Sequence, residues 1–314
     1  MRRVLADPSF PREQVRADLD GLDVLVETGS PPWSGEDVVG LLSFEPVTAS
    51  DLSALPALRV VATPSVGFDH VDVAAATERG VWVCNVPDYC VEEMADHTIA
   101  LLLALARGVV ELDRSVRDGG WDHLAAGRLG RLADVRLGIV GFGRIGRAVA
   151  ARALALDMEV SAFDPLVEPD LIAATGARPA SLEDLLRSST AVTVHAPLTP
   201  KTHHLLGADE LAMLPLGAYV VNVARAGLVD SEALLAALAD GLLGGVAVDV
   251  LDVEPPDAAA PAPQLARLVV NPHAGWYSEE AEQAAPRRAT EAVKDVLEGR
   301  VPPNAVNEVA SSVP

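Results

Sequence analysis

Short apolar runs alternate with amphipathic stretches along most of this 314-residue chain. Apolar runs bounded by Gly, Pro or Asp predict buried strands, and apolar positions three or four residues apart predict helices between them. A repeated strand–helix order is typical of parallel sheets with helices on both faces. The pattern therefore predicts an α/β protein, and a long helical stretch after residue 90 divides its strands into two sets.

The first set predicts a compact open sheet of flavodoxin-like type. Its strands are expected at residues 3–6, 23–26, 38–44, 59–63 and 81–86, with helices at 12–19, 50–55 and 71–79. The second set predicts strands at 136–140, 159–163, 191–195, 218–223, 245–250 and 268–271, with helices at 145–156, 181–187, 209–213 and 231–240. Six strands with intervening helices are enough for a complete Rossmann domain.

A glycine turn opens the second set. Gly141, Gly143 and Gly146 follow a short apolar run at the spacing G-x-G-x-x-G and precede a helical pattern. Such a turn holds a pyrophosphate against a helix N-terminus. Asp164 closes the next predicted strand, eighteen residues past Gly146. An acid there accepts hydrogen bonds from a ribose 2′-hydroxyl and repels a 2′-phosphate, so the sequence predicts NAD over NADP.

Two long helical patterns set the expected domain boundaries. One runs from residue 91 to about 116 and is predicted as a single helix that bridges domains or lines a subunit interface. The other, 279–298, is expected to return to the first sheet. The predicted substrate domain is therefore discontinuous, residues 1–92 plus 282–314, and residues 93–281 form the predicted NAD-binding domain. Two crossings between domains form a natural hinge, with the active site expected in the cleft.

Composition excludes several other functions. The formal charge of −21 disfavours nucleic acid and anionic membranes as partners. No uninterrupted apolar run is long enough to span a membrane, and the N-terminus lacks the apolar core of a signal peptide. The two cysteines, Cys84 and Cys90, have no metal-type spacing and are typical of a reduced cytoplasmic protein. No spacing of His, Cys and acids predicts a metal site.

Three residues with complementary chemistry each follow a predicted strand late in the chain: Arg225, Glu254 and His273. In open α/β sheets, ligands bind beyond the carboxyl ends of the strands. A guanidinium can grip a carboxylate, an imidazole can donate a proton near neutral pH, and a carboxylate can fix the imidazole tautomer. Each residue alone has a structural alternative: a surface ion pair, a loop carboxylate or a buried histidine. Together they favour reduction of a keto acid.

With these residues assembled, the chain resembles the D-2-hydroxyacid dehydrogenase family over nearly its whole length, and within it the branch of the C-terminal-binding proteins. Besides the glycine turn and the three strand ends, the similar stretches are residues 65–72, 84–87, 91–98, 163–165 and 195–199. The branch resemblance lies in Asn271-Pro-His-Ala-Gly-Trp-Tyr-Ser278 and in the ending at 298–303.

The resemblance implies roles for individual residues. His273 would be the acid/base, Glu254 its partner, and Arg225 a substrate ligand. The other substrate-binding positions would be Val66 and Gly67, through their backbone N–H groups, and Trp276 as a pocket wall. Asp249 would contact the nicotinamide carboxamide. The cofactor would also be lined by Thr98, Gly141, Gly143, Arg144, Ile145, Gly146, Asp164, His195, Ala196, Pro197 and Ala224. A homodimer through the cofactor domains is implied as well.

Two positions depart from the family pattern. Ala226 stands where a glycine usually follows the substrate-binding arginine, so the loop is expected to adjust slightly. Thr63 stands where the C-terminal-binding branch has an arginine, so the substrate carboxylate would lose one cation. The branch resemblance therefore does not carry the identity of the substrate.

The leading hypothesis is an NAD-dependent oxidoreductase that interconverts a 2-keto acid and a D-2-hydroxy acid. One alternative is an NADH-sensing binding protein of corepressor type, with little or no turnover. Another is a formate or phosphite oxidiser on the same fold, disfavoured by an apolar pocket near Trp276. Trp33, Phe44 and Tyr89 are further candidates for shaping specificity. The particular 2-hydroxy acid and the direction of flux stay open.

Overall fold

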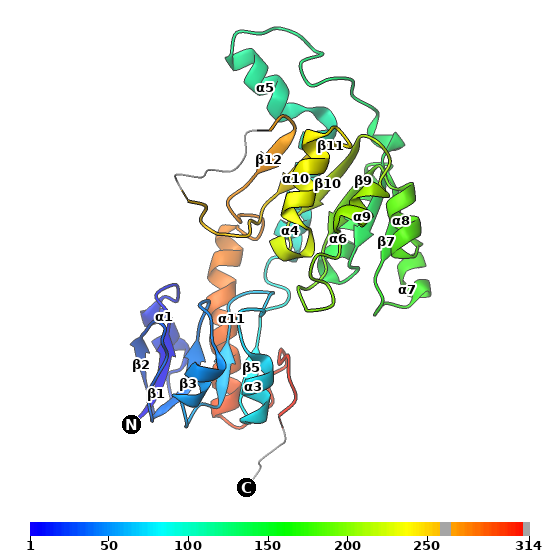
Figure 1. Ribbon diagram of the computed structural model, residues 1–314. Coiled ribbons are helices and arrows are strands. Elements are labelled where there is room, and N and C mark those ends of the chain that lie inside the picture. The colour runs from blue at the N-terminus through cyan, green and yellow to red at the C-terminus, as the bar shows by residue number, and fades with distance from the viewer. Residues whose placement is uncertain (258–264, 310–314) are drawn as a thin grey trace. The chain divides into compact units, whose positions relative to one another are not determined.

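The computed structural model describes residues 1–257 and 265–309, and Figure 1 follows their path. The chain divides into two compact units, Met1–Tyr89 with Ser278–Pro314, and Cys90–Tyr277. These limits fall within four residues of the expected ones. Residues 258–264 and 310–314 belong to the predicted domains but lie outside the described residues. Each unit contains one parallel sheet, so the predicted α/β class with two parallel-sheet domains is confirmed.

Unit 1 is a five-stranded sheet in the order β2-β1-β3-β4-β5. This is the flavodoxin-like order. All the strands are parallel, and successive strands are added on one side of β1 and then, from β3 onward, on its other side. The strands are β1 (Arg2–Ala6), β2 (Val24–Thr28), β3 (Val38–Leu42), β4 (Val60–Ala62) and β5 (Trp82–Cys84). β3, β4 and β5 are shorter than the apolar runs that predicted them, because those runs continue into the loop that follows, whereas β1 and β2 are each one residue longer than predicted.

Helices cover both faces of this sheet. On one face α1 (Arg12–Asp18) and α11 (Glu279–Leu297) pack on Val4, Val39 and Val60. On the other, α2 (Ala49–Ser53) and α3 (Val73–Glu78) pack on a core that contains Leu41. α11 is contributed by the C-terminal part of the chain and contacts β3, β4 and β5, so unit 1 is completed only by residues distant in sequence.

Unit 2 is a seven-stranded parallel sheet in the order β12-β11-β10-β9-β6-β7-β8. The strands are β6 (Arg136–Val140), β7 (Glu159–Phe163), β8 (Arg178–Pro179), β9 (Ala191–Val194), β10 (Ala218–Asn222), β11 (Leu243–Val248) and β12 (Leu268–Val270). The order reverses between β6 and β9, the switch point at which nucleotides bind in this fold. The sequence predicted six of these strands and missed β8, whose two residues give no periodic signal.

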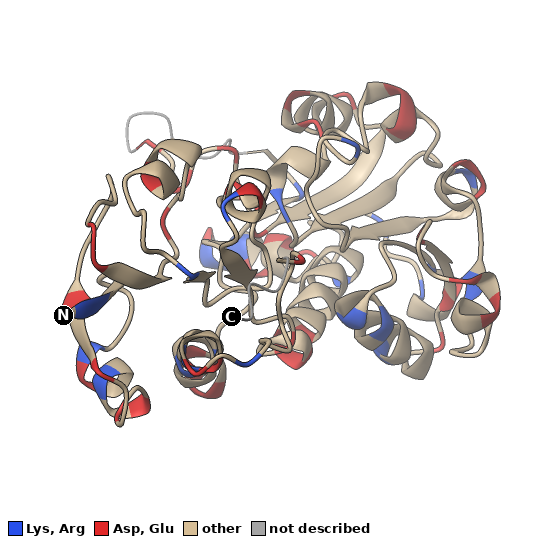
Figure 2. Cartoon of the chain, turned by 90° about the horizontal axis from the view of Figure 1, so that it is seen from below, with Lys and Arg blue, Asp and Glu red and all other residues tan. Residues whose placement is uncertain are grey.

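Two cores cover this second sheet. One lies under α4 (Val91–Arg107), α6 (Arg144–Ala155) and α7 (Pro169–Ala173). The other lies under α8 (Leu182–Ser188), α9 (Ala208–Ala212) and α10 (Ser231–Ala239). Most of these helices contain acidic residues, which outnumber the basic ones in the six helices together, and the ribbon in Figure 2 is coloured by these residue types. Among the described residues, no helix combines the length and apolarity that a membrane span needs.

The single helix expected at 91–116 is wrong. The segment forms α4 and then α5 (Val109–Arg117), with Gly108 between them at φ 59°. This left-handed conformation ends a helix and favours glycine. A Cβ atom on Gly108 would also lie 2.3 Å from Cβ of Ala126, so the loop that follows α5 packs directly on the break. Leu105 and Ala106 before Gly108 and Val109 and Val110 after it continue the apolar pattern, which is why sequence periodicity does not show the break.

Candidate active site

The glycine turn lies at the carboxyl end of β6, where α6 begins. Gly141 has φ 93°, and Cβ on this residue would lie 2.6 Å from the backbone nitrogen of Ala196. A Cβ on Gly146 would lie 2.2 Å from the carbonyl oxygen of Gly141. Cβ on Gly143, by contrast, would meet nothing within 4 Å. Gly141 and Gly146 are therefore required by the protein's own packing, whereas Gly143 leaves open space above the turn.

Asp164 supports this turn from the end of β7. One carboxylate oxygen accepts a hydrogen bond from the backbone N–H of Phe142 at 2.8 Å, and the other accepts one from Leu166 N–H at 2.9 Å. The carboxylate is therefore held beside the turn, at the position where this fold recognises ribose hydroxyls.

Other predicted cofactor residues surround the same edge. Arg144 and Ile145 are the first residues of α6, and His195, Ala196 and Pro197 follow β9. The His195 N–H donates to Val140 O at 2.7 Å, which ties this loop to the strand before the glycine turn. Burial lowers the pKa of His195 to about 4, so the ring is neutral at physiological pH.

Thr98 lies on α4 and is fully buried. Its hydroxyl donates to Met94 O at 2.7 Å within the same helix. Its single hydroxyl donor is therefore already used within α4, and its oxygen can still accept a hydrogen bond.

His273 and Glu254 are in direct contact. The imidazole Nδ1 lies 2.7 Å from Glu254 Oε2, and the other carboxylate oxygen accepts a 2.7 Å hydrogen bond from Leu251 N–H. Since an ionised carboxylate only accepts, the Nδ1 atom carries the proton and donates it. Because Nδ1 is occupied by Glu254, Nε2 is the nitrogen available to a ligand. Both side chains are about one-third exposed, so a ligand can reach the ring.

Arg225 follows β10, and Asn222 holds its backbone. The Asn222 side chain is buried; its Nδ2 donates to Arg225 O at 2.8 Å and its Oδ1 accepts from Ala224 N–H at 3.1 Å. The guanidinium donates to Ala224 O at 2.8 Å. Ala226 begins a short 3-10 turn without a positive φ, so alanine fits the position without strain.

Asp249 is buried at the carboxyl end of β11 and clamps the backbone after His273. Its two oxygens accept hydrogen bonds from Ala274 N–H at 2.9 Å and Gly275 N–H at 2.7 Å. Burial raises the pKa of Asp249, but contact with His97 and the two N–H donors outweighs it, so the pKa is held below its usual value. His273 itself has φ 54°, a conformation that needs such support in a non-glycine residue.

His97 lies on α4 with Nε2 3.6 Å from Asp249 Oδ1. A Cβ on Gly275 would lie 3.0 Å from the His97 ring. His97 and Asn222 thus both support the site without having been predicted as part of it. The position of His97 seven residues into α4 gives no signal of its contact with a strand end more than 150 residues later.

The aromatic candidates differ in accessibility. Trp276 packs edge-on against Tyr277, with ring centroids 5.7 Å apart. Trp33 is 1% exposed, and its indole N–H donates to Pro46 O, so its expected role in shaping specificity is wrong: the side chain belongs to the core of unit 1. Phe44 is 54% exposed.

Val66 and Gly67 lie in unit 1, in the loop after β4. Thr63, at the start of this loop, is fully buried, and its hydroxyl lies 2.8 Å from that of Ser65.

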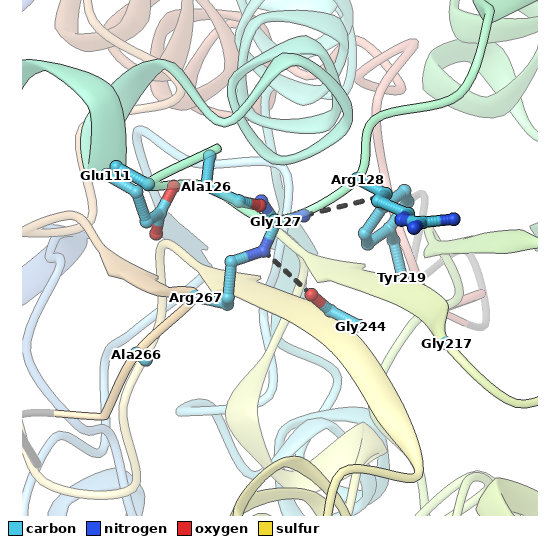
Figure 3. Close-up of a pocket in the computed structure, with 10 residues that line it drawn as sticks. Glu111, Ala126, Gly127, Arg128, Gly217, Tyr219, Gly244, Ala266 and Arg267 are labelled. Carbon is cyan, nitrogen blue, oxygen red and sulfur yellow. Dashed lines mark hydrogen bonds between the residues drawn. The ribbon is translucent and has the colours of Figure 1, made fainter. Parts of the chain in front are cut away.

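A separate pocket of about 450 Å³ lies at the opposite, amino-terminal edge of the unit 2 sheet (Figure 3). Arg267 crosses it and donates to Gly244 O, Ala126 O and Leu105 O, tying the loop after α5 to the sheet. None of the predicted site residues lines this pocket. Among the described residues, no group of three potential ligands could hold a metal ion.

The residues around the glycine turn fit a dinucleotide. The open space at Gly143, the fixed carboxylate of Asp164 and the N-terminus of α6 provide the features that pyrophosphate and ribose require. The strand ends carrying Asp249 and the His273–Glu254 pair belong to the same sheet. Such an arrangement defines a nucleotide-dependent dehydrogenase.

Comparison with known proteins identifies the family. Residues 99–275 match the NAD-binding domain of the D-isomer-specific 2-hydroxyacid dehydrogenases. A glyoxylate reductase of Korarchaeum cryptofilum is 39% identical over 275 residues, covering 87% of this chain and 83% of that protein. A D-3-phosphoglycerate dehydrogenase of Methanocaldococcus jannaschii is 36% identical over 272 residues and 86% of this chain, which spans only 52% of that protein's length. The structure of D-lactate dehydrogenase from Aquifex aeolicus, complexed with NAD and lactic acid, superposes with a TM-score of 0.85 at 25% identity, covering 98% of this chain and 100% of that one.

The chain belongs to the D-2-hydroxyacid dehydrogenase family. The expected NAD-dependent oxidoreduction of 2-hydroxy acids is confirmed at this level, and so is NAD as the cofactor. The comparisons give no support to the corepressor alternative. The resemblance to the C-terminal-binding branch stays a prediction.

Two of the three glycines in the turn, Gly143 and Gly146, provide a matched test. Gly146→Ala places a methyl group on a backbone carbonyl and is expected to cost about 2 kcal/mol, or roughly 4 to 8 °C in Tm, in the protein without cofactor. Gly143→Ala meets no protein atom, so it should leave that Tm within about 2 °C while weakening NAD binding at least about tenfold by crowding the phosphates. Calorimetry and NADH fluorescence titration measure the two effects. Equal losses of Tm in both variants would contradict this division of roles.

Proposed function

We propose that this chain reduces a 2-keto acid to a D-2-hydroxy acid, and catalyses the reverse reaction, with His273 as the acid/base. The observation that carries the proposal is the 2.7 Å contact between His273 Nδ1 and Glu254. This contact leaves Nε2 available to exchange a proton with the substrate oxygen. NAD supplies or accepts the hydride when it is bound.

In this proposal His273 transfers one proton. In the direction of reduction, the protonated ring donates the Nε2 proton to the substrate oxygen as negative charge develops on it. Glu254 stabilises the positively charged ring before transfer, and it keeps the remaining proton on Nδ1 afterwards. Leu251 N–H holds the carboxylate in place throughout. In oxidation the neutral ring accepts the proton at the same nitrogen.

Arg225 is proposed to bind the substrate carboxylate and carbonyl oxygen, since a guanidinium can donate to both at once. Asn222 fixes its backbone on both sides, which reduces the entropy lost on binding. Val66 and Gly67 are proposed to donate backbone N–H groups to the same carboxylate, and Trp276 to contact the rest of the substrate.

We propose that Asp249 has two roles. Its hydrogen bonds to Ala274 and Gly275 hold the strained backbone of His273, and its oxygens retain lone pairs for the nicotinamide carboxamide. We likewise propose that the remaining predicted residues contact the cofactor: Thr98, Arg144, Ile145, His195, Ala196, Pro197 and Ala224.

His273→Gln is expected to lower kcat by at least about two orders of magnitude while NADH binding stays within a factor of about three, because glutamine cannot donate and recover a proton near neutral pH. Glu254→Gln keeps a polar partner for the ring without its charge and should lower kcat by an intermediate factor. His123→Gln, at a 90% exposed side chain, is the control. Steady-state kinetics with glyoxylate and NADH measures all three variants. Wild-type turnover in His273→Gln would refute the assignment.

We also propose a cytoplasmic homodimer that associates through unit 2. Both cysteines are free and buried, which supports a reducing compartment. The segment from α5 through the following loop exposes four large apolar side chains: Val109, Val116, Trp121 and Leu124 are each at least 50% exposed, and Trp121 is 91% exposed. Apolar side chains gathered in one segment are typical of an interface.

Trp121→Glu is therefore expected to raise the dimer dissociation constant at least about a hundredfold, since it puts a charge into an apolar interface. Val301→Glu changes a 70% exposed apolar residue of unit 1 and should leave the association unchanged. Light scattering over a dilution series distinguishes the 32.8 kDa chain from a particle of twice that mass. A wild-type protein that stays monomeric at high concentration would exclude the dimer.

A further inference from the structure

The loop after β4 is held by an unusually complete set of hydrogen bonds. Ser65 O accepts from Val86 N–H at 2.9 Å, and Gly67 O accepts from the Ser65 hydroxyl at 2.6 Å. Val66 O accepts from Asn85 Nδ2 at 2.7 Å. Three consecutive carbonyl groups are thus occupied from within unit 1, and the hydroxyl of Thr63 supports the Ser65 side chain.

The N–H groups of the same loop are used differently. Within residues 1–257 and 265–309, the structure shows no hydrogen bond donated by the backbone N–H of Val66 or Gly67. Since their carbonyls are fixed, these two neighbouring donors are held ready for an acceptor. Paired backbone donors of this kind bind an anion through hydrogen bonds without contributing a net charge. They suit one carboxylate, as the proposed function requires.

The loops at the surrounding edge of unit 1 are poor in cationic side chains that could bind a second anion. The segments that follow its strands, residues 7–11, 29–37, 43–48, 63–72 and 85–90, contain no lysine or arginine. At this edge they carry the acids Asp7, Glu45, Asp69, Asp72 and Asp88, whereas Glu36 and Asp37 directly precede β3 at the opposite edge, where Asp37 pairs with Arg3. Of the neighbouring cations, Arg12 donates to Val26 O, and Arg288 pairs with Asp88 at 2.6 Å. His70 is the one histidine in these segments.

The side chains at this edge are also partly apolar. Phe44 is 54% exposed directly after β3, and its ring lies 6.0 Å from that of His70. Its backbone N–H donates to the buried carboxylate of Asp7, so the residue is fixed beside a negative charge. A phosphate dianion approaching this edge would meet carboxylates and an aromatic ring, and would lose solvation without gaining a partner.

We propose that the substrate carries a single anionic group, its carboxylate, and that its other substituent is uncharged. This inference rests on the proposed function and narrows it. It separates this chain from a dehydrogenase of phosphorylated hydroxy acids, even though a D-3-phosphoglycerate dehydrogenase is among its relatives. The specificity-determining feature is the neutral hydrogen-bond network of Thr63, Ser65 and Asn85. It presents the backbone N–H groups of Val66 and Gly67 to the carboxylate, and it contains no guanidinium that could attract a second anion.

Two substrates that differ only by a phosphoryl group test the inference. We expect kcat/KM with NADH to be at least about a hundredfold higher for hydroxypyruvate, or for glyoxylate or pyruvate if one of these is preferred, than for 3-phosphohydroxypyruvate. Equal or higher kcat/KM for the phosphorylated acid would overturn the inference while leaving the proposed function intact. If none of the four acids is reduced while NADH still binds, the proposed function fails, and the inference fails with it.

A charge placed at this edge provides a second test. Phe44→Lys adds a cation at an exposed position and is expected to raise the ratio of kcat/KM for 3-phosphohydroxypyruvate over hydroxypyruvate at least about tenfold. Phe44→Gln removes the ring without adding charge and should change the ratio less than about threefold. Circular dichroism confirms that both variants are folded. The same ratio in both variants would show that charge at this edge does not control specificity.

Discussion

The hydrogen bond between Glu254 and His273 is the interaction on which the proposed chemistry depends. At 2.7 Å it fixes which imidazole nitrogen carries the resident proton and which is free to exchange one. The contact is supported on both sides: Leu251 N–H holds the carboxylate, and Asp249 accepts from the two N–H groups that follow His273. A histidine with positive φ is thereby held in one position.

The same principle recurs at the other functional positions, where polar side chains hold the loop backbone in place. Asn222 holds the loop that carries Arg225, Asp164 holds the glycine turn, and Asn85 holds Val66. Each of these residues lies at or just after the carboxyl end of a strand, where loop backbone has no partner in the sheet. Satisfying that backbone internally leaves the neighbouring donors and charged groups preorganised, which lowers the cost of binding.

Most strands and helices could be predicted from the sequence because the hydrophobic periods of strands and helices differ. The glycine turn could be predicted because few residues other than glycine fit a tight turn. The strand order could not be read from the pattern, although a βα repeat with a glycine turn limits it to a few arrangements. Arg225, Glu254 and His273 were identifiable because each lies within six residues of the carboxyl end of a strand. Contacts across distant segments were not predictable: His97 against Asp249, or Ala126 packed on Gly108. Trp33 was misjudged because an exposed and a buried tryptophan look alike in a Pro-rich loop.

The most direct test of the central claim is the fate of the hydride. The protein is incubated with a 2-keto acid and NADH deuterated at C4 of the nicotinamide, on each face in turn, and the product is examined by NMR and chiral chromatography. The account predicts deuterium at C2 of a D-2-hydroxy acid from one deuterated face, and none from the other. Product of the L configuration, or a C2 hydrogen taken from solvent, would contradict it.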